Sequence, residues 1–389
     1  MRLIHTSDWH LGRSLHGEPL LEEQAALLTW LLDIAREHEV HAVIVAGDIY
    51  DRAVPQLDAV RLLDRALADF SRAGIPLVVT SGNHDSAVRL GFGSVLNEQA
   101  GVHLRTSVDD LARPVLLDDE HGQVAVYGIP YLLPDAVMGP LGVTERSHFA
   151  VLRAATSRVR ADACARGVAR VVVAAHAFVT GGQSSESERD IRIGGIGDTP
   201  VAAFDGVDYV ALGHLHGAQR VSAPQAATTA RYSGSPLAFS FSERNHTKSV
   251  TLVDLDGAGR VGTQLLATPV PRPLREVRGR LADLLERSRT DLADVAAAWV
   301  KVVLTDPVRP RAAMERLRAV WPHTLVLDFA PDVALADTAT DVHRLARTSD
   351  PVDICALFVE WVDGAAPTSP QRAVLQEVVE TATWAEVVL

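Results

Sequence analysis

The chain has 389 residues, of which 47% are apolar and 22% charged, a balance that indicates a folded protein and excludes wholesale disorder. Its net charge of −12, from 37 basic and 49 acidic residues, argues against a protein that grips nucleic acid mainly through its own basic surface. No apolar run approaches the roughly 20 residues that cross a membrane. No secretion signal is found at the N-terminus, and the two cysteines, Cys164 and Cys355, exclude a disulfide scaffold. We therefore expect a cytoplasmic protein of two or three domains without a membrane segment.

The first 270 residues alternate short apolar runs with helical patterns. In chain order, the pattern predicts a strand, a helix, a strand, a helix and a strand at residues 2–6, 20–37, 42–46, 57–73 and 75–80. Further strands are expected at residues 124–129, 170–175, 209–212, 249–255 and 261–267. Such runs, separated by helices, predict the α/β class, with two mixed β-sheets flanked by helices in an α+β four-layer sandwich.

Three prolines, Pro269, Pro271 and Pro273, indicate a domain boundary near residue 270, so that residues 1–270 would form the main domain. Residues 271–335 show the order strand, helix, strand, helix, strand, which predicts a smaller α/β capping domain. Residues 336–389 would form a C-terminal helical segment. Its last apolar stripe either packs inside the chain or docks a partner, and it consists of Val374, Leu375, Val378 and Val379.

Five short segments of the main domain share one design. Each follows an apolar run and carries His, Asp or Asn in the loop beyond it. They are Asp8-Trp9-His10, Gly47-Asp48-Ile49-Tyr50-Asp51, Gly82-Asn83-His84-Asp85, His176 and Gly213-His214-Leu215-His216. Loops at the carboxyl ends of strands are where α/β sheets build binding sites, so we expect these segments to converge.

The residue types indicate a site for two divalent metal ions. Carboxylate and imidazole together favour manganese, iron or zinc over calcium or magnesium. In Asp8-x-His10 the two side chains lie two residues apart, so both point to the same side of a strand end. The carboxylate of Asp48 can bridge two ions, and the glycines before Asp48, Asn83 and His214 allow close backbone approach. Two such ions would leave coordination positions open for water and substrate.

Each segment by itself has an ordinary interpretation. Asp-x-His or His-x-His alone is more often a loop or a hydrogen-bonded polar pair, and a single histidine such as His176 after a buried strand is more often part of the core. Gly-Asn-His-Asp alone is compatible with a simple turn. Five such segments in this order, each after a strand-like run, favour the metal site.

The five segments resemble the motifs of the calcineurin-like metallophosphoesterase superfamily, D-x-H, G-D-x-x-D, G-N-H-D/E, H and G-H-x-H. Longer stretches are similar to one family within it, the SbcD nuclease subunits of bacterial SbcCD complexes. They are MRLIHTSDWHLGRSLHG, VAGDIYDRAVP, TSGNHDSAVRL, ERDIRIGGIG, DYVALGHLHGAQ and RYSGSPLAFSFSERNHTKSV. This resemblance extends from residue 1 to about residue 250, and the C-terminal third matches only in layout and length.

The resemblance implies a role for each motif residue. His84 would not bind metal but would face the phosphate, where it would stabilise the transition state or protonate the leaving oxygen. Asp51 would orient His84. The two ions, with Asp48 shared between them, would be held by Asp8, His10, Asp48 and His216 and by Asp48, Asn83, His176 and His214.

The resemblance also implies a manganese-dependent DNA exonuclease for duplex ends and an endonuclease for single strands and hairpins, acting in DNA repair, recombination and replication. It implies an SbcC-type coiled-coil ATPase as partner, and a homodimer of this chain within a heterotetramer. The sequence has no Walker-type phosphate loop, so any ATP would be bound by the partner.

Two other functions remain open at this point. The motifs specify phosphorus chemistry and not polymer size, so a phosphoesterase for a cyclic nucleotide or nucleotide ester is compatible with them. A DNA-end scaffold with vestigial metals is disfavoured, because every expected ligand and His84 are present. The C-terminal 120 or so residues favour the nuclease, because a small-molecule enzyme does not need them.

Overall fold

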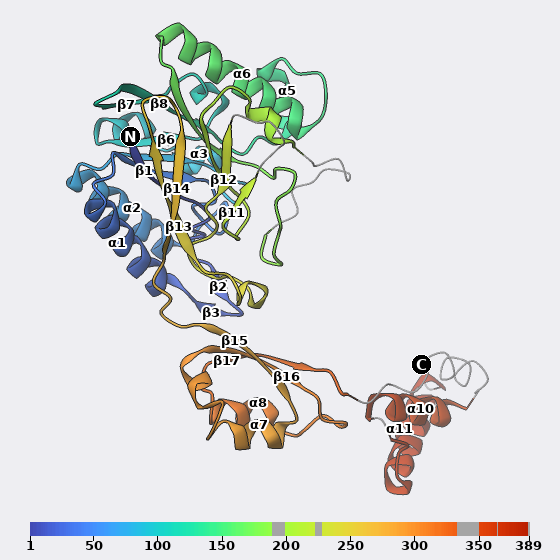
Figure 1. The fold of residues 1–389 in the computed structure, drawn as a ribbon. Coiled ribbons are helices and arrows are strands. Elements are labelled where there is room, and N and C mark those ends of the chain that lie inside the picture. The colour runs from blue at the N-terminus through green and yellow to red at the C-terminus, as the bar shows by residue number, and fades with distance from the viewer. Residues whose placement is uncertain (189–198, 222–227, 333–349, 364, 388–389) are drawn as a thin grey trace. The chain divides into compact units, whose positions relative to one another are not determined.

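The computed structural model describes residues 1–188, 199–221, 228–332, 350–363 and 365–387 (Figure 1). The chain divides into two compact units, Met1–Pro271 and Arg272–Leu389, and the division falls among the three prolines noted above. The boundary expected between residues 335 and 336 lies outside the described residues.

The first sheet of the N-terminal unit has the strand order β14-β13-β1-β4-β5-β6. Strands β1, β4, β5 and β6 run parallel, whereas β13 is antiparallel to β1 and β14 is antiparallel to β13. All five residues of β4 are buried, as expected of a β-branched run covered on both faces. The strands are β1 (Arg2–Thr6), β4 (Ala42–Ala46), β5 (Leu77–Thr80), β6 (Val102–Arg105), β13 (Ser249–Leu255) and β14 (Val261–Ala267).

The second sheet has the order β11-β12-β10-β9-β8-β7. Its four central strands, β12, β10, β9 and β8, run parallel, and β11 and β7 lie antiparallel at the two edges. The strands are β7 (Val115–Asp119), β8 (Gly122–Ile129), β9 (Arg170–His176), β10 (Tyr209–Gly213), β11 (Gln219–Val221) and β12 (Thr229–Tyr232).

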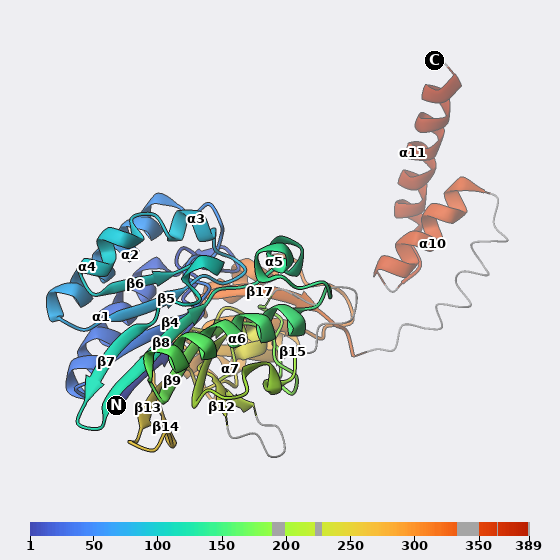
Figure 2. The ribbon, with the colours of Figure 1, turned by 90° about the horizontal axis from the view of Figure 1, so that it is seen from above.

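The two sheets face each other, and helices cover their outer faces (Figures 1 and 2). Between them lie apolar side chains from both sheets, including Ile44 of β4 and Val172 of β9. Helices α1 and α2 cover the first sheet, and α6 covers the second. The predicted α/β class, with two mixed sheets between helices, is therefore confirmed. The helices are α1 (Leu21–Glu37), α2 (Leu57–Ala73), α3 (Ala87–Leu90), α4 (Ser94–Gln99), α5 (Pro134–Leu141) and α6 (His148–Arg166).

Helix α2 illustrates how the sequence pattern becomes packing. Leu62, Ala66 and Phe70 lie four residues apart, so they share the face that is buried against the first sheet. Burying a leucine or phenylalanine side chain contributes about 1.5–3 kcal/mol, which anchors the helix. Gly74 ends it with a left-handed φ of 69°, a conformation that glycine adopts without steric cost.

Short elements complete the N-terminal unit. Strands β2 and β3 form an antiparallel hairpin directly after the first expected ligands. The 3-10 helix at Phe241–Glu243 precedes β13. The short elements are β2 (Ser14–Leu15), β3 (Glu18–Pro19) and the 3-10 helices Val108–Asp110, Val201–Phe204 and Phe241–Glu243.

The C-terminal unit begins with a parallel sheet of order β15-β16-β17 and continues into two helices. The expected strand-helix-strand-helix-strand order is observed, and its core includes Leu284, Leu317 and Trp321. A further 3-10 helix spans Ala293–Ala297. The elements are β15 (Leu274–Gly279), α7 (Leu281–Arg287), β16 (Trp299–Leu304), α8 (Ala313–Arg318), β17 (Thr324–Phe329), α10 (Pro351–Asp363) and α11 (Ser369–Val387).

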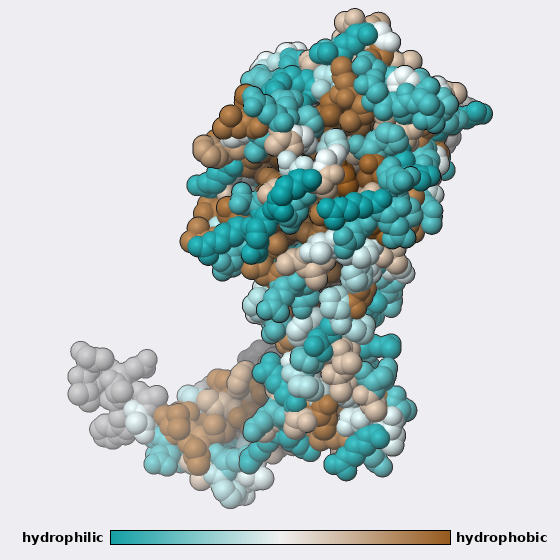
Figure 3. Space-filling view, turned by 90° about the vertical axis from the view of Figure 1, so that its left-hand side faces the viewer, coloured by the Kyte–Doolittle hydropathy of each residue, from teal (hydrophilic) through white to brown (hydrophobic). Residues whose placement is uncertain are grey.

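Helices α10 and α11 contact each other and expose apolar side chains on their surface, visible as brown atoms at the lower left of Figure 3. The exposed apolar residues are Ile354, Phe358, Val362, Val374 and Val378. Among the described residues, no helix is both long and apolar enough to cross a membrane.

Candidate metal centre

The fold brings the five polar segments to one edge of the two facing sheets. In the first sheet, the loops after the neighbouring strands β1, β4 and β5 carry them, and in the second sheet they lie at the ends of the neighbouring strands β9 and β10. The carboxyl ends of parallel strands share an edge, so the convergence follows from the topology. Apart from the half-buried Asn83, the expected ligands and His84 are buried, and they are Asp8, His10, Asp48, His84, His176, His214 and His216.

Four of these residues hold a strained backbone. Asp8, His10, Asp48 and His214 have φ angles of 55°, 44°, 50° and 112°, in the left-handed region that side chains with a Cβ rarely adopt. Each such residue costs on the order of 1–3 kcal/mol, so the surrounding structure must hold it there. The Asp8 amide donates to the Gly47 carbonyl and the His10 amide to the Asp48 carbonyl, each at 3.0 Å. Strain is concentrated where the sequence predicted ligands.

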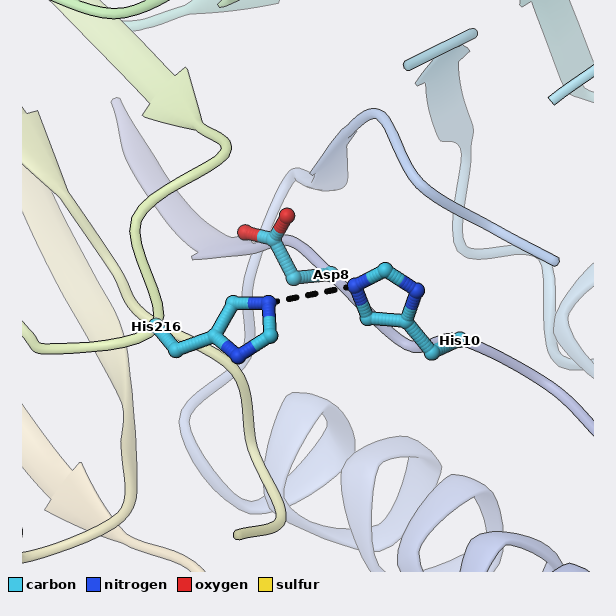
Figure 4. Close-up of side chains that lie close together, drawn as sticks. All are labelled: Asp8, His10 and His216. Carbon is cyan, nitrogen blue, oxygen red and sulfur yellow. Dashed lines mark hydrogen bonds between the residues drawn. The ribbon is translucent and has the colours of Figure 1, made fainter. Parts of the chain in front are cut away.

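The first group of side chains consists of Asp8, His10 and His216 (Figure 4). One potential ligand atom from each lies within 4.8 Å of the others. The Nε2 atoms of His10 and His216 face each other at 3.2 Å. Two ring nitrogens at this distance need a proton or a cation between them, because two lone pairs repel. The donor set of this group therefore fits a divalent cation.

The second group lies around the side chain of Asn83. Its Oδ1 atom is 2.9 Å from Nε2 of His176 and 3.2 Å from Nδ1 of His214. The Nδ1 atom of His176 is 3.0 Å from the Ala46 carbonyl and donates to it, which leaves Nε2 with its lone pair on the side of Asn83. An amide oxygen and two imidazoles are thus brought together from three different loops.

Asp48 lies between the two groups. Its Oδ2 atom is 3.6 Å from Nε2 of His10 and 3.6 Å from Nε2 of His176. Asp8 is also close to both groups, because one of its oxygens lies within 4.8 Å of ligand atoms of Asp48 and His176. The His214 amide donates to both carboxylate oxygens of Asp8, at 3.1 Å each. The resemblance implied that Asp8 binds one ion only, whereas the structure places its carboxylate near both groups.

His84 faces the same space from the loop after β5. Its Nε2 atom is 3.9 Å from Oδ2 of Asp48, and its ring lies 4.7 Å from that of His10. Its Nδ1 atom is 2.7 Å from the main-chain carbonyl oxygen of Asp51. A contact between Asp51 and the ring thus exists, and it is made by the backbone. The Asp51 carboxylate lies 3.7 Å from Nε of Arg13 and 3.8 Å from Nδ1 of His10.

Burial dominates the electrostatics of this region. Desolvation raises the pKa of Asp8, and it raises that of Asp48 well above its usual value, with the nearby charges of Asp8 and Asp85 adding to the effect. Desolvation also lowers the pKa of His10 well below its usual value. A bound cation favours ionised carboxylates and neutral imidazoles, so it would oppose the raised pKa values of Asp8 and Asp48, whereas the lowered pKa of His10 already favours the neutral ring. The mixed N and O donors suit manganese, iron or zinc.

The glycines at the strand ends allow the close packing that the sequence predicted. A Cβ on Gly47 would overlap the His176 ring, and one on Gly82 would overlap the Asp48 side chain. A Cβ on Gly213 would overlap the main-chain oxygen of Ala46, which belongs to the facing sheet. Side chains at these positions would therefore push the ligand loops apart.

Several supporting residues were missed by the sequence analysis. The Asp85 carboxylate accepts hydrogen bonds from the amides of Ile49, Tyr50 and Gly82, at 3.0, 2.9 and 2.9 Å, and so ties two ligand loops together. Ser187, Glu243 and Lys248 lie behind His216. The only signal for Glu243 and Lys248 in the sequence was the stretch that ends in SFSERNHTKSV, and Ser187 lies one residue before the stretch ERDIRIGGIG. Most of the stretch ERDIRIGGIG, from residue 189 onward, lies outside the described residues.

Comparisons with known proteins identify the family of the chain. A family model described as "Calcineurin-like phosphoesterase" matches residues 1–218, and one described as "Type 5 capsule protein repressor C-terminal domain" matches residues 270–360. The SbcD subunit of the SbcCD nuclease from Escherichia coli (strain K12) is 34% identical over 78% of this chain and 78% of its own. The SbcD subunits of Rhodobacter capsulatus and Bacillus subtilis (strain 168) are 36% and 38% identical, over 85% and 65% of this chain and 84% and 66% of theirs.

Proposed function

Because this chain belongs to the SbcD nuclease family of calcineurin-like phosphoesterases, we propose that it is the nuclease subunit of an SbcCD-type complex and hydrolyses phosphodiester bonds of DNA with two divalent metal ions. The observation that carries the proposal is the pair of facing, buried ligand groups at the common edge of the two sheets. The kinship with nucleases favours DNA over the small substrates that the motifs alone left open.

In this proposal, each ligand group holds one ion. Asp48 serves both, because its Oδ2 atom is equally distant from a histidine of each group. When bound, the two ions, most simply Mn²⁺, neutralise phosphate oxygens and lower the pKa of a water that attacks phosphorus. One ion would be held by Asp8, His10, Asp48 and His216, and the other by Asp48, Asn83, His176 and His214.

His84 acts on the substrate rather than as a ligand in this assignment. Its Nδ1–H donates to the Asp51 carbonyl at 2.7 Å, which fixes the plane of the ring and directs Nε2 toward the centre. A proton taken up at Nε2 can stabilise the transition state or pass to the departing sugar oxygen, as a general acid does. Asp51 positions this ring through its main chain.

The ATPase partner has a candidate docking surface on α10 and α11. Ile354, Phe358 and Val362 recur every four residues on α10 and so share one face, and Val374 and Val378 do the same on α11. Exposed apolar faces of this kind fit an apolar groove or coiled coil on another protein. Removing residues 365–389 should abolish binding of an SbcC-type ATPase in a pull-down assay and leave metal binding intact. Retained binding would refute the docking role of α11.

The homodimer has a candidate surface on the N-terminal unit. The exposed apolar side chains of Val60 in α2, Phe92 just before α4 and Leu96 in α4 line one cavity of about 620 Å³. Val88 of α3 and Phe92 just beyond it are 85% and 86% exposed. Contiguous exposed apolar side chains mark protein–protein contact sites. Phe92→Glu should convert a dimer into a monomer in analytical ultracentrifugation. A wild-type chain that sediments as a monomer would overturn this part of the proposal.

One assay tests the function itself. Purified chain with Mn²⁺ is given linear duplex DNA or the small ester bis(p-nitrophenyl) phosphate, with and without the ATPase. We expect DNA cleavage that EDTA abolishes and that the ATPase stimulates. Activity on the small ester alone would refute the nuclease.

We also place the enzyme in the cytoplasm, which holds the chromosomal DNA of bacteria.

A further inference from the structure

A buried ion pair lies directly behind the metal centre. Glu243, at the end of the 3-10 helix, and Lys248, just before β13, are 1% and 5% exposed, and the ammonium of Lys248 donates to the Glu243 carboxylate. Lys248 Nζ donates in addition to the His216 carbonyl at 3.0 Å and to Ser235 Oγ at 2.9 Å, so its three hydrogens all have acceptors. Burying two charges costs several kcal/mol, and well-packed apolar residues would stabilise the fold equally well. The pair therefore calls for a role beyond stability.

The ion pair reaches the ring of His216 through a serine. Ser187 Oγ lies 2.6 Å from Nδ1 of His216 and also contacts Oε1 of Glu243, which is itself 3.3 Å from that Nδ1. A carboxylate only accepts hydrogen bonds, so the Ser187 hydroxyl donates to Glu243 and its oxygen is left to accept from the ring. Both routes, direct and through serine, place the hydrogen of His216 on Nδ1. The lone pair then lies on Nε2, the atom that faces Nε2 of His10 at 3.2 Å.

Residues 185–188, which include Ser187, also hold the backbone of His216. Oε1 of Glu188 accepts from the His216 amide at 2.7 Å, while its Oε2 accepts from the amide and hydroxyl of Ser185 at 2.7 Å each. Arg13, three residues after His10, donates to the Ser187 carbonyl at 2.9 Å. Residues 185–188 thus fix both the main chain and the ring of one expected ligand.

We propose that Glu243 is a positioning residue of the metal centre: with Lys248 as its counter-ion and Ser187 as a relay, it holds His216 in the Nδ1–H tautomer and aims Nε2 at the ion. This inference rests on the proposed function, because it takes His216 to be a metal ligand. The physical reason is general: a hydrogen bond to the distal ring nitrogen fixes the tautomer and orientation of a metal-binding histidine and makes it a better ligand. The proposal thereby gives a function to the stretch SFSERNHTKSV, which contains none of the expected metal ligands.

The test removes both charges at once, so that no unpaired charge is left in the core. Glu243→Gln/Lys248→Met keeps the net charge and the side-chain volumes. The control is Asp119→Asn/Arg170→Met, an ion pair whose side chains are 0% and 5% exposed and which lies at the start of β9, the end of that strand opposite His176. Asp119 also accepts the N-terminal ammonium, so the control should lose at least as much stability as the test variant. Mn²⁺ binding is measured by calorimetry, and the His216 tautomer by ¹⁵N NMR of the metal-free protein with labelled histidine.

We expect the control to bind Mn²⁺ like the wild type and to keep the tautomer. In the test variant, one of two ions should bind about 10- to 100-fold more weakly, and His216 should lose its uniform Nδ1–H form. Unchanged affinity together with an unchanged tautomer would overturn the inference. If the test variant does not fold, Ser187→Ala provides the same comparison without removing a charge. A wild-type chain that binds no metal would refute the proposed function, whereas the NMR spectrum would still decide whether Glu243 sets the tautomer.

Discussion

Without bound metal, the neighbouring carboxylates of the metal centre should lower the stability of the protein. The substitution Asp48→Asn should remove this destabilisation. Asp8 and Asp48 are 0% and 2% exposed, and their nearest ligand oxygens lie within 4.8 Å of each other. At an effective dielectric constant of about 20, two unit charges at that separation repel by about 3 kcal/mol. Burial raises both pKa values, so partial protonation relieves some of this repulsion. We therefore expect the substitution to raise the free energy of unfolding of the metal-free protein by roughly 1–3 kcal/mol.

Asparagine is the appropriate replacement because it keeps the shape and one contact. Its Oδ1 can still accept the hydrogen bond from the His84 amide, which is 2.8 Å long. Its amide group would replace Oδ2 and face Nε2 of His176, which can accept a hydrogen bond when that ring is neutral. The main loss is the charge that attracts the cations.

The order of stabilities should reverse when metal is added. Wild type gains RT ln(1 + [Mn²⁺]/Kd), about 2.7 kcal/mol per ion at 100 times Kd, whereas Asp48→Asn should gain almost nothing. Each kcal/mol corresponds to about 2–4 °C in Tm for a domain of this size. Thermal unfolding in EDTA and in Mn²⁺ measures both effects. The variant should melt above wild type in EDTA and below it in Mn²⁺.

Asp85→Asn is the matched control, with the opposite expected sign. The Asp85 carboxylate accepts three backbone amides, and an asparagine there would turn a donor toward at least one of them. It should lower stability by about 1–3 kcal/mol in EDTA. If Asp48→Asn is less stable than wild type in EDTA, the inference that repulsion between Asp8 and Asp48 destabilises the metal-free protein is wrong. If the variant gains as much stability from Mn²⁺ as wild type does, Asp48 is not needed to bind the ions.

Three further outcomes are expected. His84→Ala should bind Mn²⁺ and DNA like wild type but cleave about 10²- to 10⁴-fold more slowly in single-turnover assays, and wild-type rates would contradict its role. In Gly213→Ala, the added methyl group would overlap the Ala46 oxygen of the facing sheet and should displace the ligand loops, so that cleavage slows about 100-fold. Mn²⁺ affinity by calorimetry that equals that of wild type would contradict the displacement of the loops. Complete burial lowers the pKa of His5 to about 3 from its usual 6.5, so its contribution to stability is fully present above pH 6.5 and is lost as the pH falls toward 3. Between these values, the free energy of unfolding should fall by up to about 1.4 kcal/mol per pH unit more steeply in wild type than in His5→Gln, as urea titrations at several pH values would measure.

The sequence determined the class of the fold and the chemistry of the site, because both are written in local patterns. A run such as that of β4, apolar at every position, is buried on both faces wherever it packs, so alternating runs of this kind and amphipathic helices already predicted helix-covered sheets. Asp8, His10 and the other ligand candidates directly follow such runs, which placed them at strand ends before any packing was known.

The tertiary structure decided which groups meet, because those contacts join residues far apart in the chain. Asn83 meets His176 and His214 only because β5 and the pair β9 and β10 lie in sheets that face each other. The contact of Asp51 with His84 runs through a carbonyl, which no side-chain pattern encodes. Glu243 reaches His216 through Ser187, 56 residues away in the chain, and hydrophobic periodicity carries no information about such a pairing.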